Sequence, residues 1–289
     1  MIKVKISGGL GNQLFQYAFG QYAAQKLNTE VLYHAQTKLI HKNFTQRELD
    51  IEKFDLPINF IKGEFDEKSI FYFKNLSRYE RKLTQFFPFI NKKVKIQSPN
   101  IHEPVKDIKD NCYYEGYWQN SIYPDSISEL LKSKIELSKA SYNKLNDIII
   151  EIENSNSVGI HIRRDDYIKI PANTKIYNIC DVDYYKKAMD HIEKKISNPR
   201  FFIFTQDIEW AKENFIGDQF HFITGNSGIE DMIIMSRCQN QIIANSTFSW
   251  WAAYLNKNSN KIIIAPKKWY KGKLNETTEK FIPKQWLRI

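Results

Sequence analysis

Cysteine is scarce in this sequence of 289 residues, which contains only three cysteines. Cys112, Cys180 and Cys238 lie far apart, and none belongs to a C-x-x-C pair. An odd number of widely spaced cysteines argues against both a disulfide scaffold and a zinc ribbon. We therefore expect a cytoplasmic protein.

Long apolar runs are also missing. The sequence has no stretch of about 18 consecutive apolar residues, the length that a membrane-spanning helix needs. No signal-peptide core precedes the first strand pattern, at residues 2–6. Internal repeats and low-complexity segments are absent, and 42% apolar and 26% charged residues are ordinary globular usage. Disordered, collagen-like and coiled-coil chains are thereby disfavoured.

The charge balance is basic, with 42 Lys and Arg against 33 Asp and Glu and a formal charge of +9. A basic excess attracts nucleic acid, anionic lipid or phosphorylated small molecules. The lysines are scattered rather than clustered, so we expect no nucleic-acid partner. Peripheral contact with a membrane is compatible with this charge.

The first half begins with a regular α/β pattern. A strand at residues 2–6, a glycine-rich turn, a helix and a strand at 31–33 predict an α/β domain. Residues 36–112 mix short apolar runs with prolines and predict an irregular, partly helical insertion. Two more elements are expected, a strand over 113–118 and a helix over 138–153 with Ser138 as its N-cap.

The second half alternates strands with helices. The expected strands are residues 158–162, 201–204, 220–223, 241–244 and 261–264. The expected helices are 183–196, capped by Asp183, one from about 207, 229–238 and 247–255. This alternation predicts a doubly wound parallel sheet, which binds ligands at the carboxyl ends of its strands.

A glycine-rich turn follows the first strand, with the sequence Gly8-Gly9-Leu10-Gly11-Asn12-Gln13. Such a turn at a helix N-terminus can hold a phosphate or a sugar hydroxyl on backbone N–H groups, or it can be purely structural. Leu14 occupies the place of the third glycine in a dinucleotide fingerprint, and the Gly-Lys-Ser/Thr ending of a P-loop is missing. Both nucleotide motifs are therefore disfavoured.

Two adjacent arginines, Arg163 and Arg164, follow the strand that contains His161. Burying such a pair without anionic partners is costly. The planar guanidinium matches phosphate oxygens, which favours a diphosphate clamp. Neutralisation by Asp165 and Asp166, which come next, is the structural alternative.

Polar residues follow two further strands. Asp207 could accept hydrogen bonds from a guanine or a ribose, or could cap a helix. Ser246, Thr247 and Ser249 could donate to phosphate, or could cap a core helix. Asp181-Val182-Asp183 matches a D-x-D metal motif, but three residues match easily by chance, and no G-x-S-x-G hydrolase motif is present.

Several motifs together carry a family resemblance. They are Gly8 to Tyr17, Gly116-Tyr117-Trp118-Gln119, His161 to Tyr167, Asp183-Tyr184-Tyr185, Phe204 to Trp210, Asp231 to Cys238, and Ile243 to Trp251, the most specific. Over nearly its whole length, the chain resembles glycosyltransferase family 11, the bacterial α-1,2-fucosyltransferases.

The resemblance implies a GT-B fold, α/β, with two Rossmann-like domains facing a cleft: an acceptor-side domain at 1–135 and a GDP-fucose-binding domain at 136–289. It implies inverting transfer of L-fucose from GDP-β-L-fucose to the 2-hydroxyl of a terminal galactoside in a surface glycan or O-antigen repeat, with no required metal or other cofactor. Acceptors of this kind are often lipid-linked, which suggests a cytoplasmic enzyme at the inner face of the membrane.

The resemblance also implies roles for individual residues. Arg163 would grip the donor phosphate with Arg164 beside it, and His161 and Asp207 would bind the guanosine. The Ser246, Thr247 and Ser249 hydroxyls would lie near the phosphates, and the loop with Gly9, Gly11 and Asn12 would line the cleft that faces fucose and acceptor.

Two departures leave the donor open. The family commonly has Gly at the position of Asp165 and an acidic residue at that of Gln206. Transfer from another GDP-sugar is therefore an alternative, as is a non-catalytic glycan-binding or nucleic-acid-binding module. We expect Arg163 to stabilise the departing GDP and Asp166 to act as general base, with His161, Asp165 and Glu115 as alternatives.

Overall fold

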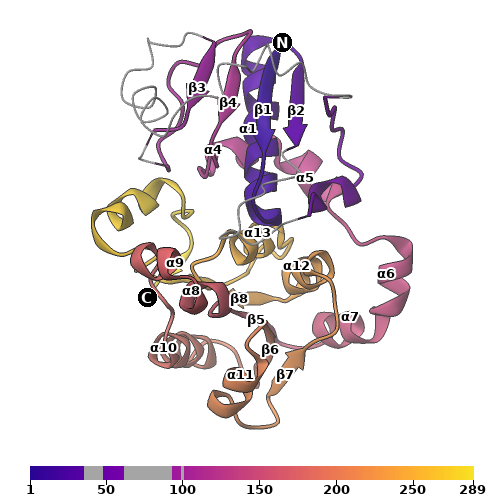
Figure 1. Ribbon diagram of the computed structural model, residues 1–289. Coiled ribbons are helices and arrows are strands. Elements are labelled where there is room, and N and C mark those ends of the chain that lie inside the picture. Colours follow the sequence, from indigo (N-terminus) through magenta and orange to yellow (C-terminus); the bar gives the residue numbers. More distant parts are fainter. Residues whose placement is uncertain (36–47, 62–92, 99–100) are drawn as a thin grey trace. The chain divides into compact units, whose positions relative to one another are not determined.

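The computed structural model describes residues 1–35, 48–61, 93–98 and 101–289. The chain forms two compact units, Met1–Leu131 and Lys132–Ile289 (Figure 1). The sequence analysis expected the boundary between them after residue 135. Most of the expected irregular insertion, residues 36–112, lies outside the described residues. In the described part of the chain, no helix is long and apolar enough to cross a bilayer.

A four-stranded parallel sheet forms the N-terminal unit, in the order β2-β1-β4-β3. Its strands are β1 (Ile2–Ile6), β2 (Val31–Ala35), β3 (Val94–Ile96) and β4 (Tyr113–Glu115). Helix α1 (Leu10–Leu27) packs on β1 and buries Leu14, Phe15 and Phe19. It ends at Asn28, which adopts the left-handed conformation typical of a helix terminus. The smaller elements are η1 (Asp50–Lys53) and α4 (Ile122–Asp125), and α5 (Ser128–Lys134) crosses the boundary between the two units.

A six-stranded parallel sheet forms the C-terminal unit, in the order β10-β9-β8-β5-β6-β7. The strands are β5 (Ser157–Ile162), β6 (Arg200–Thr205), β7 (Phe220–Ile223), β8 (Asn240–Ile242), β9 (Ile263–Ala265) and β10 (Leu287–Arg288). Chain order reverses between β5 and β8, so this is a doubly wound sheet with its topological switch point at the carboxyl ends of these two strands. The predicted parallel sheet is thus confirmed, with β10 as an added edge strand.

The helices α10 (Val182–Glu193), α11 (Ile208–Asn214) and α12 (Gly228–Arg237) contact strands of this sheet. The unit also contains α6 (Lys139–Lys144), α7 (Asn146–Glu153), α8 (Asp165–Lys169), α9 (Pro171–Ile176), α13 (Thr247–Leu255) and η2 (Gly272–Lys280).

Two local predictions about these helices were wrong. The single helix expected over 138–153 is broken at Leu145, although Ser138 does cap α6 by accepting from the Ser141 N–H at 3.1 Å. Asp181, not Asp183, caps α10, because its Oδ1 accepts from the Tyr184 N–H at 2.9 Å.

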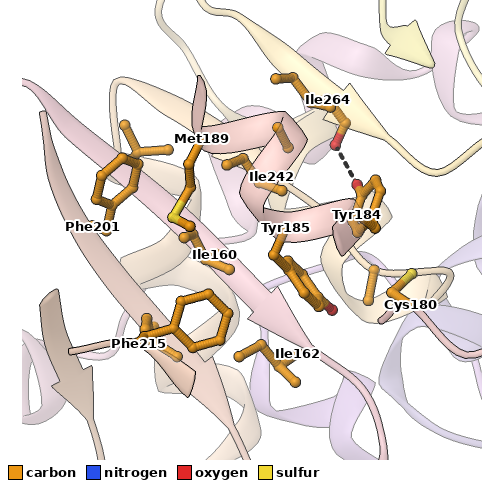
Figure 2. Close-up of a cluster of buried hydrophobic side chains, with 14 of the residues drawn as sticks. Ile160, Ile162, Cys180, Tyr184, Tyr185, Met189, Phe201, Phe215, Ile242 and Ile264 are labelled. Carbon is orange, nitrogen blue, oxygen red and sulfur yellow. Dashed lines mark hydrogen bonds between the residues drawn. The ribbon is translucent and has the colours of Figure 1, made fainter. Parts of the chain in front are cut away.

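A buried apolar cluster lies between β5 and the helices on one face of the sheet (Figure 2). Ile160 and Ile162 of β5 pack there beside Tyr185 of α10 and Phe215. The Tyr185 hydroxyl donates to the His161 carbonyl at 3.1 Å. The core therefore fixes the carboxyl end of β5, from which the arginine pair emerges.

Candidate active site

The site of the C-terminal unit lies at the switch point between β5 and β8. Arg163 and Arg164 follow β5, and Ser246 follows β8 as the N-cap of α13. Parallel strands end at one edge of the sheet, so these residues share the edge where doubly wound proteins bind nucleotides.

Arg164 turns toward the end of β6. Its Nε donates to Asp207 Oδ2 at 3.2 Å, and its Cζ lies 4.1 Å from the centroid of the Trp210 ring. Asp207 is the N-cap residue of α11 but makes no side-chain capping bond, so the structural alternative of a helix cap does not apply. The Asp207 N–H donates to Thr205 Oγ1 at 3.0 Å. Asp207 and Trp210 thus hold the Arg164 guanidinium between a carboxylate and an aromatic face.

Arg163 lies near the aromatic ring of Tyr167 in α8. Its Cζ lies 5.6 Å from the centroid of the Tyr167 ring, and the Tyr167 hydroxyl donates to the Asn245 carbonyl at 2.9 Å. The two adjacent arginines therefore have different neighbours, Asp207 and Trp210 beside Arg164 and Tyr167 beside Arg163.

His161 is buried at the end of β5, with 6% of its surface exposed. Burial, and then the nearby Arg163 charge, lowers the pKa of His161 to about 3. Its ring centroid lies 5.1 Å from that of Phe248 at the start of α13. Because the imidazole is neutral at neutral pH and a weak base, His161 is poorly suited to the general-base role left open by the sequence.

The hydroxyl residues at the start of α13 differ in exposure and contacts. Ser246 Oγ accepts from the Phe248 N–H at 3.3 Å, as a helix cap does. Ser249 is fully buried. Its hydroxyl lies within hydrogen-bond distance of two backbone carbonyls, those of Ala244 and Ser246, and can donate to either. Thr247 is half-buried. Ser249 thus bonds to the backbone around the start of α13, and phosphate contact by Ser246, Thr247 and Ser249 stays a prediction.

Asn245, which the sequence analysis did not assign, anchors two distant segments to the site. Its fully buried amide donates to the carbonyls of Asn178, at 2.6 Å, and Trp269, at 2.9 Å. Its position between a buried strand and a capping serine could have marked Asn245 as important in the sequence. Its hydrogen-bond partners could not be identified there, because they lie far away along the chain.

In the N-terminal unit, the glycine turn lies at the carboxyl end of β1. Gly9 is the N-cap residue of α1, and Gly11 is buried in its first turn. Asn12 Oδ1 accepts from Gln119 Nε2 at 2.9 Å, which joins the turn to the segment after β4.

Two buried glutamines of α1 also fix this turn. Gln13 Nε2 donates to the Gly8 carbonyl at 2.8 Å, and Gln16 Oε1 accepts from the Ser7 N–H at 2.8 Å. Sequence reasoning missed both residues, although polar residues on a buried helix face were a signal. Glu115, one alternative base, forms an ion pair with Lys5 at 2.8 Å.

The proposed general base is described only in part. Asp165 and Asp166 begin α8, but their side chains lie outside the described residues. The assignment of Asp166 stays a prediction. Gln206 is exposed beside Asp207.

Comparison with known proteins identifies the family. Glycosyl transferase family 11 matches residues 105–289. The O-antigen biosynthesis glycosyltransferase WbnK of Escherichia coli is 30% identical, over 92% of this chain and 94% of the relative. The alpha-1,2-colitosyltransferase of Escherichia coli is also 30% identical, over 100% of this chain and 99% of the relative.

Solved structures agree on the fold. The fucosyltransferase NodZ from Bradyrhizobium matches with a TM-score of 0.53 and 14% identity, over 87% of this chain and 91% of that chain. The NodZ alpha-1,6-fucosyltransferase soaked with GDP-fucose gives 0.54. The expected GT-B-type α/β fold is confirmed, and the chain belongs to glycosyltransferase family 11 and is an enzyme that transfers sugar.

Proposed function

We propose that this enzyme transfers L-fucose from GDP-β-L-fucose to the 2-hydroxyl of a terminal galactoside, with inversion. The observation that carries the proposal is the arginine pair at the β5–β8 switch point, flanked by His161 and Asp207 in a family 11 chain. Fixed cations at a nucleotide-binding crevice suit a sugar diphosphate.

Charge explains the chemistry. The acceptor oxygen bonds to the anomeric carbon as the fucosyl–phosphate bond breaks, and the electron pair leaves on GDP. Arg163 stabilises that negative charge, and a fixed donor of this kind contributes about 3–4 kcal/mol to the transition state. The hydroxyl proton passes to a general base, for which we propose Asp166. The arginines would make a bound metal unnecessary.

A second candidate donor is a different GDP-sugar, GDP-colitose in particular. The colitosyltransferase that aligns over the whole chain favours it. Colitose is the 3-deoxy counterpart of L-fucose, so the two donors differ by one hydroxyl. Gln206, next to Asp207, is the departure from the family pattern that keeps this alternative open.

Thermal unfolding with candidate donors tests the proposal. Ligand at about 100 times its dissociation constant adds about 2.7 kcal/mol, a shift of several degrees. We expect GDP-fucose to stabilise the protein in EDTA as well as without it, and UDP-galactose to have no effect. Stabilisation by GDP-colitose or GDP-mannose alone would show that the donor is that sugar nucleotide rather than GDP-fucose, and the fold assignment would be unaffected. Stabilisation by galactosides alone, without turnover, would favour a binding module.

We also propose a lipid-linked acceptor and peripheral contact with an anionic membrane surface. Residues 266–289 carry seven basic and two acidic side chains, a large share of the net charge of +9. Basic surface segments bind anionic lipid with about 1 kcal/mol per side chain. We expect the protein to cosediment with phosphatidylglycerol vesicles at low salt. It should not cosediment with phosphatidylcholine vesicles, or with either kind at high salt. Equal partition into both vesicle types would contradict it.

A further inference from the structure

Tyr117, at the carboxyl edge of the N-terminal sheet, is more exposed to solvent than its neighbours in the chain. It follows β4 directly, and 42% of its surface is exposed. The next residues, Trp118 and Gln119, are only 2% and 6% exposed. Tyr117 therefore reaches solvent between the half-buried Gly116 and the buried Trp118.

The backbone that carries Tyr117 is held by side-chain amides. Gln97 Oε1 accepts from the N–H groups of Tyr117, at 2.7 Å, and Trp118, at 3.2 Å. Gln16 Nε2 donates to the Gly116 carbonyl at 2.9 Å. A Cβ on Gly116 would lie 2.5 Å from Gln97 Cβ, so the close approach of Gln97 requires glycine there.

The following residue is strained. Trp118 has a φ of 53°, which is rare for a bulky residue and persists only where the surroundings fix it. Its ring stacks on Phe19 of α1, with centroids 4.3 Å apart and an interplanar angle of 17°. This turn sends Trp118 into the core and leaves Tyr117 at the surface, and such strain is concentrated at functional sites.

The exposed ring lies beside the glycine turn. A Cβ on Gly8 would lie 3.4 Å from Tyr117 Cε1 and 3.0 Å from Asn12 Nδ2. The Asn12 side chain is itself oriented by Gln119. An aromatic ring and an oriented amide thus lie together at the edge where parallel sheets bind ligands.

This pair suits a sugar ring. A pyranose has a face of C–H groups that packs on an aromatic ring, and hydroxyls at its rim that need hydrogen-bonding partners. We infer that Tyr117 is the stacking platform for the terminal pyranose of the acceptor, with Asn12 binding one of its hydroxyls. The inference rests on the proposed function, because it takes the acceptor to be a galactoside.

Two variants of Tyr117 test it. A panel of β-galactosides first gives the acceptor that the wild type uses fastest, and KM is then measured for acceptor and donor separately. Tyr117→Ala should raise the acceptor KM about tenfold or more, as losing a stacked aromatic does elsewhere. Tyr117→Phe should stay near wild type because it keeps the ring. Both variants should keep the wild-type dissociation constant for GDP.

Tyr142 of α6 provides a matched control, since it is a tyrosine with a similar exposed fraction of 38%. Tyr142→Ala should leave the acceptor KM unchanged. An unchanged acceptor KM in Tyr117→Ala would overturn the inference while the proposed function stands. A rise in the donor KM alone would place the ring under the donor sugar and also overturn it. If the wild type used no galactoside, the proposed function would fail first.

Discussion

At the scale of single residues, the two arginines after β5 have different surroundings. Arg164 is held by Asp207 and Trp210, and Arg163 lies near Tyr167 and the buried His161. The Arg164 Nε lies 3.2 Å from Asp207 Oδ2, within salt-bridge distance. We propose that Arg163 stabilises the departing GDP and that Arg164, held by Asp207 and Trp210, positions the donor.

Substitution of Arg163 should remove transition-state stabilisation. We expect Arg163→Ala to lower kcat by about 10²–10³-fold. Arg163→Lys should also be poor, because a point charge replaces a planar fork. Initial rates give the effect, and thermal unfolding shows whether the fold persists. Near-normal turnover in a well-folded Arg163→Ala enzyme would remove this role.

Trp210 should contribute to donor binding by holding the Arg164 guanidinium in place. Loss of a cation–π contact costs about 0.5–2 kcal/mol, so Trp210→Leu should raise the donor KM by about threefold to thirtyfold and leave the acceptor KM unchanged. Trp210→Phe should lie between Trp210→Leu and wild type. Arg237 packs on Tyr142 at 5.5 Å near the amino end of β8, so Tyr142→Leu controls for losing such a contact elsewhere. Equal donor KM values in all these variants would contradict the positioning role.

His161 should make stability depend on acidity. Its pKa in the folded protein, about 3, is below the ordinary value of 6.5, so the unfolded chain binds the proton more readily. Its contribution is complete above pH 6.5 and decreases as pH falls toward 3. We expect the free energy of unfolding of the wild type to fall by about 2 kcal/mol from pH 7.5 to pH 5 because of His161, and the His161→Phe variant should not show this part of the decrease. Urea unfolding at both pH values measures this, and parallel losses in both proteins would refute it.

At the scale of elements, buried strands were predictable and their partners were not. β5 and β6 are short, mainly apolar runs between polar breaks, so sequence alone located them and the residues that follow. β10 spans only Leu287–Arg288, too short to form a pattern. The break at Leu145 and the capping of α10 by Asp181 depend on local geometry. Trp210, Asn245 and Tyr117 were missed because their roles arise from contacts between distant segments.

The turn between β1 and α1 allows a matched pair of substitutions. Gly8 has a φ of 80°, and a Cβ there would lie 3.0 Å from Asn12 Nδ2. Gly9 has a φ of −74°, and a Cβ there would meet nothing within 4 Å among the described residues. Gly8→Ala should therefore cost about 1–2 kcal/mol, and Gly9→Ala should be close to neutral. Chemical denaturation compares them, and equal costs would contradict the turn geometry.

At the scale of the whole molecule, each unit presents ligand-binding residues at the carboxyl edge of a parallel sheet. The C-terminal unit has cations and a buried histidine, which suit a nucleotide diphosphate. The N-terminal unit has a glycine turn, an asparagine and an exposed tyrosine, which suit a sugar. We propose that the enzyme binds its donor on the C-terminal unit and its acceptor on the N-terminal unit.

We propose that this enzyme transfers fucose from GDP-fucose without a metal. The most direct test incubates the wild-type enzyme with GDP-fucose and a terminal β-galactoside in excess EDTA, and determines the product linkage by NMR. We predict GDP release matched by an α-linked fucose on the galactose 2-hydroxyl. Transfer only after a divalent metal is restored, or only from a different GDP-sugar, would contradict the account.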